Sequence, residues 1–143
     1  MLAEIYDRCD AVEECYEFLL GYAAQGLPTD QGSKSGGQVR DFLQRAVEAL
    51  TGLPEACAIA VKQEGLEPAA KYLALIAVLN RDSRDSLAAI ELVLAQPAIS
   101  SQLVDNLNAS IHLRALLTDL FLLGEILKKQ SKPAVETVAS DGA

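Results

Sequence analysis

The chain has 143 residues, of which half are apolar, 5% aromatic and 22% charged, and its formal net charge is -8. This length suits one domain that buries a core without disulfides, and the composition excludes a disordered chain. Nucleic acid and anionic membranes are disfavoured as partners, because the chain repels phosphate groups and has no cluster of Lys or Arg to counter that repulsion.

Abundant Ala and Leu, few aromatic residues and no Trp favour helices over strands. The first helix is predicted from Leu2 to about Gln25, where Gly26-Leu27-Pro28 ends it. Apolar residues alternate along it at spacings of three and four, as on a helix with one buried face. This stripe consists of Leu2, Ile5, Cys9, Val12, Tyr16, Leu19 and Ala23.

Pro28 to Gly37 is polar and rich in glycine, and we expect a flexible loop there. The second helix follows and ends at Gly65. Pro54 predicts either a kink or a break at Thr51-Gly52, because proline removes a backbone hydrogen bond and clashes with the preceding turn. The second stripe consists of Val39, Leu43, Ala46, Leu50, Leu53, Cys57 and Ala60.

The third helix is predicted from Pro68 to Gln96, and the fourth runs from a cap at Ser100 or Ser101 to about Lys129. Two polar residues interrupt the third stripe, which consists of Leu73, Ile76, Asn80, Ser83, Leu87, Ile90 and Leu94.

Short later connections make neighbouring helices run in opposite directions. The sequence therefore predicts an all-α fold, with one antiparallel up-down-up-down four-helix bundle over residues 1–130. A flexible tail is expected at residues 131–143, where no apolar period continues.

The cysteines number three and show no metal-binding spacing, which favours a reducing cytoplasm over a disulfide framework. No secretory signal is recognisable at the acidic start of the chain, which also favours a cytoplasmic protein. Cys9 and Cys57 fall at similar heights on the first two helices, so they form either a thiol pair with redox or metal chemistry or two small fillers of the core. Cys15 lies off the stripe and is expected to be exposed.

The only histidine, His112, lies on the fourth predicted helix in NASIHLRALLTD. A single histidine on a long bundle helix resembles the histidine phosphotransfer domains, in which an exposed imidazole accepts a phosphoryl group. Those domains usually have a small or basic residue three or four places after the histidine. Leu113, Arg114 and Ala115 stand one place out of that register. The alternative is an ordinary, partly buried or interfacial histidine.

Glu13, Glu14 and Glu17 form an EExxE run that is similar to half of the MazG-like nucleotide pyrophosphohydrolase motif. In that family a second ExxD pair completes the set of carboxylates around Mg²⁺. No such pair follows here, so a solvated acidic face is the alternative. The sequence predicts no catalytic residue, no metal and no cofactor.

A diffuse group of polar residues falls near the middle of the third and fourth predicted helices. Buried polar groups must find partners, so such a layer either fixes the helix register or lines a small-molecule or metal site. Its members are His112, Arg114, Asn80, Ser83 and Asn106. A ligand site predicts an enclosed pocket beside His112, whereas phosphotransfer predicts an exposed imidazole.

The fourth predicted helix carries more apolar residues than one stripe can bury, which is typical of an interface. We expect Leu116, Leu120, Leu123 and Leu127 to contact a second copy in a homodimer. The preferred function is therefore a non-enzymatic helical bundle that self-associates and acts through protein–protein contacts, as an adaptor or accessory protein. A ligand-binding bundle and a phosphotransfer or pyrophosphohydrolase activity are the alternatives.

Overall fold

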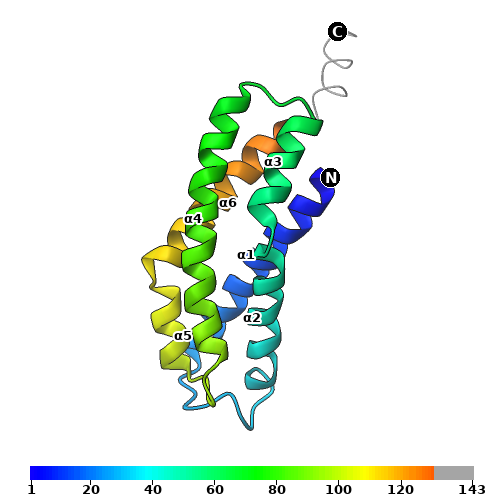
Figure 1. The fold of residues 1–143 in the computed structure, drawn as a ribbon. Coiled ribbons are helices and arrows are strands. Elements are labelled where there is room, and N and C mark those ends of the chain that lie inside the picture. The colour runs from blue at the N-terminus through cyan, green and yellow to red at the C-terminus, as the bar shows by residue number, and fades with distance from the viewer. Residues whose placement is uncertain (131–143) are drawn as a thin grey trace.

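The computed structural model describes residues 1–130, and this part of the chain forms six helices and no strand. The helices are α1 (Leu2–Ala24), α2 (Gly36–Leu50), α3 (Leu53–Gln63), α4 (Ala69–Leu94), α5 (Ser101–Asn108) and α6 (Ile111–Gln130). Figure 1 shows one elongated body in which α2 and α3 follow one another alongside α4. The all-α prediction is confirmed. The expected tail at residues 131–143 lies outside the described residues.

The second predicted helix is broken into α2 and α3 rather than kinked. Gly52 has φ 78 and ψ 3, a left-handed conformation that glycine adopts without the steric penalty of a side chain. Pro54 follows in the first turn of α3, where a missing backbone N–H does no harm. The glycine ends one helix and the proline helps to start the next.

The prediction of one continuous fourth helix is wrong, because α5 ends at Asn108 and α6 starts at Ile111. Asn108 is buried, and its Nδ2 donates to the Leu19 carbonyl on α1 at 3.1 Å. Ser110 accepts a hydrogen bond from the His112 N–H through its own Oγ at 3.3 Å. Such side-chain bonds to the backbone favour a new helix start over a continued helix. The expected cap at the start of α5 is Ser100, whose Oγ accepts from the Leu103 N–H at 3.0 Å.

Two helices, α1 and α4, run uninterrupted past both breaks. Both contact α2 and α5 towards one end of the molecule and α3 and α6 towards the other (Figure 1). Apolar side chains from all six helices meet between them in one continuous core. The predicted stripe of α1 is largely right, although Cys15 and Tyr22 are buried where Tyr16 and Ala23 were expected.

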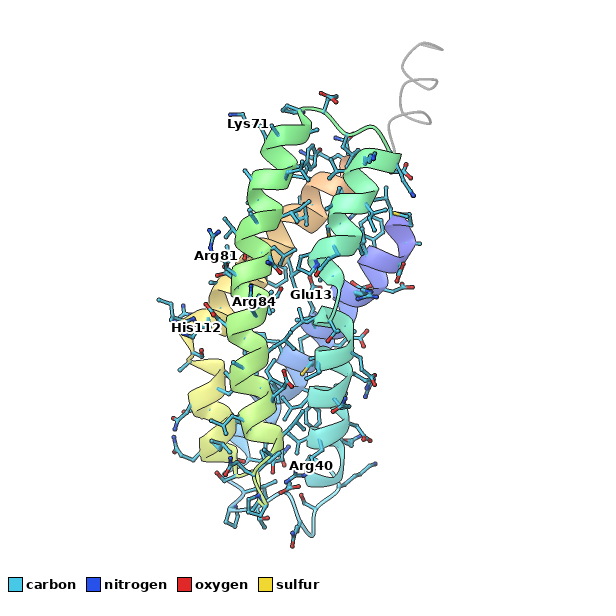
Figure 2. All side chains as sticks on the ribbon, viewed as in Figure 1. Glu13, Arg40, Lys71, Arg81, Arg84 and His112 are labelled. Carbon is cyan, nitrogen blue, oxygen red and sulfur yellow. The ribbon has the colours of Figure 1, made fainter. Side chains whose placement is uncertain are left out.

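The segment expected to be a flexible loop is anchored by a network of hydrogen bonds around Asp30. One carboxylate oxygen accepts from the Ile99 N–H at 2.7 Å, and the other accepts from Arg40 Nε at 2.8 Å. Arg40 also donates to the carbonyls of Leu94 and Gln96 at 2.9 and 2.8 Å. One guanidinium therefore ties the loop after α1, the start of α2 and the end of α4 together, at the end of the molecule where Figure 2 labels Arg40.

Across residues 1–130, the apolar stretches of the helices all fall short of what a bilayer crossing requires.

Candidate functional site

The side of α4 that points away from the core carries a continuous row of exposed residues. Their spacing alternates between four and three, so the row runs straight along the helix. We call this row the α4 seam, and it consists of Ala70, Ala74, Ala77, Arg81, Arg84, Ala88, Glu91 and Ala95. Five of its eight members are alanines, and small side chains allow another helix to approach closely.

Two exposed leucines, Leu73 and Leu92, and the acid Asp85 border the α4 seam. Leu73 is 45% exposed and Leu92 is 66% exposed, one towards each end of the helix. Exposed Arg81 and Asp85 carry opposite charges near its middle. Figure 2 shows Arg81 and Arg84 along α4, with His112 near them. This face was missed because the predicted stripe put Leu73 in the core, where Tyr72 lies instead.

The expected dimer contacts on the fourth helix face the chain's own core. Leu116, Leu120, Leu123 and Leu127 are each at most 2% exposed. These side chains are therefore unavailable to a second copy, and the expected interface needs correction. The exposed apolar side chains of α6 are Ile111, Phe121 and Leu122.

The predicted polar layer is dispersed between the core and the surface. Ser83 is 2% exposed, and its Oγ has no hydrogen-bond partner. Asn80 is half-buried, whereas Asn106, His112 and Arg114 are exposed. These five residues do not form one enclosed binding site.

His112 presents its imidazole to solvent at the start of α6. Its side chain is 54% exposed, and Nδ1 lies 3.8 Å from Asp85 Oδ2 on α4. Buried Ser86 fixes the backbone beneath it, because the Ser86 Oγ donates to the His112 carbonyl at 3.0 Å. An accessible imidazole is the arrangement that a phosphotransfer site requires.

An acidic pair between α4 and α6 was not predicted. Asp119 is only 9% exposed, and its Oδ2 has no hydrogen-bond partner. Burial and the neighbouring Asp82 carboxyl raise the pKa of Asp119 to about 7. The sequence placed Asp119 within the leucine-rich stretch of the fourth predicted helix, but it did not indicate which face of that helix is buried.

All three cysteines are buried and reduced. Burial raises the pKa of Cys9 to about 12, and the neighbouring Cys57 contributes to that rise, so these two thiols lie near one another. Burial also raises the pKa of Cys57 to about 11 and that of Cys15 to about 12, so the expected exposure of Cys15 is corrected. Thiols that stay protonated are poor nucleophiles, which matches a packing role.

A surface groove of about 540 Å³ lies between α1 and α6, and one glutamate of the EExxE run lines it. Half-buried Glu13 is in its wall, whereas Glu14 and Glu17 are exposed elsewhere on α1. Within residues 1–130 no three His, Cys, Asp or Glu side chains come together as a metal site. The floor of the groove includes Leu120 and half-exposed Phe121.

Comparison with protein family models, with curated proteins and with solved structures gave no match.

Proposed function

We propose that this chain is a non-enzymatic helical bundle that self-associates through the α4 seam and acts through protein–protein contacts. In this proposal the six helices make four antiparallel segments in up-down-up-down order, with breaks in the second and fourth. The observation that carries the proposal is the long, alanine-rich outer face of α4, bordered by exposed Leu73 and Leu92. Apolar surface of this kind on a water-exposed helix is typical of an interface. The three reduced thiols support a cytoplasmic location.

The α4 seam is complementary to itself in an antiparallel pairing. A two-fold axis that passes between two copies of α4, at the level of residue 83, places Arg81 of one copy opposite Asp85 of the second. Because a two-fold interface repeats each contact, it contains two Arg81–Asp85 ion pairs.

A charge swap tests this pairing by sedimentation equilibrium or native mass spectrometry. Arg81→Asp sets like charges opposite one another twice, and we expect the dimer dissociation constant to rise by about tenfold or more. Asp85→Arg should weaken the dimer in the same way. The double variant Arg81→Asp/Asp85→Arg restores opposite charges and should recover most of the affinity.

Both positions are exposed, so the fold should tolerate each change, and circular dichroism checks this. As a steric test, Ala77→Glu should produce a monomer, whereas Ala3→Glu on the exposed side of α1 should leave the dimer intact. A wild-type chain that stays monomeric at high concentration, or single swaps without effect on the dimer, would refute the pairing.

A second candidate function is phosphoryl acceptance at His112, which the exposed imidazole favours. Incubation with phosphoramidate, followed by detection of acid-labile phosphohistidine, tests this function. His112→Gln should abolish the signal, whereas Asp85→Asn should change only its rate. Absence of phosphohistidine in the wild-type chain would eliminate the candidate.

A further inference from the structure

The groove between α1 and α6 has the form of a docking surface for a helix. It is lined from α1 by residues spaced three and four apart, beginning at Tyr6 and ending at Glu13, and from α6 by the stretch between Leu120 and Lys128. Leu120 and Lys128 are eight positions apart on α6, so the α6 wall extends over about 12 Å at ~1.5 Å per residue. The groove is therefore about two helical turns long.

The floor and the rim of this groove differ in chemistry. Phe121, which is 53% exposed, gives the floor its accessible apolar surface, whereas Leu120 is almost fully buried. Asp10 lies on the α1 side of the rim and Glu125 on the α6 side, and together with Glu13 these acids outnumber Lys128 in the lining.

Glu13 lies half-buried among like charges on the α1 wall. Burial and repulsion by the neighbouring carboxylates of Asp10 and Glu17 raise its pKa above the ordinary value. A cationic side chain brought to the rim would relieve that repulsion. The net charge of the chain, -8, attracts such a partner over a longer range.

Gly124 leaves space at the centre of the α6 wall. A Cβ added there meets no atom within 4 Å, so packing within the described chain does not require a glycine. The missing side chain lets a partner approach the α6 backbone closely.

We infer that this groove binds a basic amphipathic helix of a partner protein, with an apolar anchor against Phe121 and Lys or Arg side chains beside Asp10 and Glu125. This is the mode in which a helix lays its apolar face into a groove, with anchors about one turn apart. The surface lies on α1 and α6, so the inference does not depend on self-association through α4.

Fluorescence anisotropy with two labelled model peptides tests the inference. Both peptides share leucines at helical spacing, and one carries lysines and the other glutamates on the polar face. The lysine peptide should bind and the glutamate peptide should not. The variant Asp10→Asn/Glu125→Gln should weaken binding of the lysine peptide by about fivefold or more, because two rim charges are lost.

A matched variant separates the groove from the overall charge of the protein. Asp41→Asn/Glu48→Gln removes the same two charges from the exposed side of α2 and should change affinity by less than about twofold. Equal losses in both variants would overturn the inference, because binding would then follow net charge alone.

A second pair of variants tests the groove by shape without changing any charge. Gly124→Leu fills the groove and should weaken peptide binding by about tenfold or more. Gly21→Leu is a matched control, since Gly21 lies on the exposed side of α1 and an added Cβ there also meets nothing within 4 Å. Unchanged affinity in Gly124→Leu would overturn the inference.

Two further results would also overturn it, by assigning the groove to another occupant. In one, spermidine displaces the peptide at equal concentration, which would indicate a small organic cation. In the other, Gly124→Leu abolishes the dimer of this chain, which would indicate a second copy as the occupant.

Discussion

Replacing Asp119 by Asn should stabilise the protein above neutral pH and have little effect in mild acid. The pKa of Asp119 rises in the folded chain from 3.8 to about 7, through burial and then the Asp82 carboxyl. A raised carboxyl pKa means that the folded chain holds a proton that the unfolded chain has lost. Stability from this group is therefore complete below about pH 4 and is lost as the pH rises towards 7.

The size of the effect follows from that shift. Each pKa unit corresponds to about 1.4 kcal/mol, and a shift of about three units gives an upper value of about 4 kcal/mol. The two carboxyls share the cost, so we expect Asp119→Asn to raise the free energy of unfolding by about 2–3 kcal/mol at about pH 8. Asn keeps the shape of Asp and offers an N–H donor to the Asp82 carboxylate, so no cavity or new charge arises.

Urea unfolding followed by circular dichroism at a series of pH values measures this prediction. Wild type and variant should agree near pH 4 and diverge towards pH 8, with a flatter profile for the variant. Asp41→Asn on the exposed side of α2 is the control and should follow the wild type. If Asp119→Asn destabilises the chain at every pH, the carboxyl makes a net favourable interaction and the reasoning is wrong.

Three further substitutions test the fold. Arg40→Ala removes three hydrogen bonds and the partner of half-buried Asp30, and it should cost about 2–3 kcal/mol in urea unfolding. Burial alone would raise the pKa of Asp30, but bonds from the Ile99 N–H and Arg40 lower it, so this stability should be lost as the pH falls below about 4. Gly52→Ala should cost about 1 kcal/mol because of its left-handed backbone, whereas Gly21→Ala in the last turn of α1 should gain up to ~1 kcal/mol. Equal effects of the two glycine changes would contradict the assigned conformations.

Local sequence signals predicted the helices well where one face was clearly apolar. In α1 the predicted stripe was right at Ile5, Cys9, Val12 and Leu19, which the structure shows to be buried. The glycine and proline at 52 and 54 indicated the α2–α3 break, because both residues act on the backbone directly. Asn108 and Ser110 were also present as signals for the second break. They were outweighed by the long run of leucines that follows them.

The buried face was ambiguous where apolar residues surround a helix. In α6 both possible stripes contain leucines, and only the positions of α1 and α4 decide that Leu116 and Leu120 face the core. In α4 the spacing of apolar residues is compatible with a buried face that contains either Leu73 or Tyr72. The predicted stripe was therefore displaced by about one residue. The acidic pair was missed for the same reason, because Asp119 is buried only once the α6 face is known.

The contact between Asp30 and Arg40 holds both sides of the loop before α2, so the chain can be opened between them. Gln31 to Lys34 lie between these two tied residues, so a cut there would leave both new ends held in place by side-chain bonds. At the opposite end, Tyr6 and Lys128 line the same groove, so the first turns of α1 lie beside the last turns of α6. A circular permutant that starts at Gly32, and in which a linker joins the end of α6 to the start of α1, should therefore keep the same core.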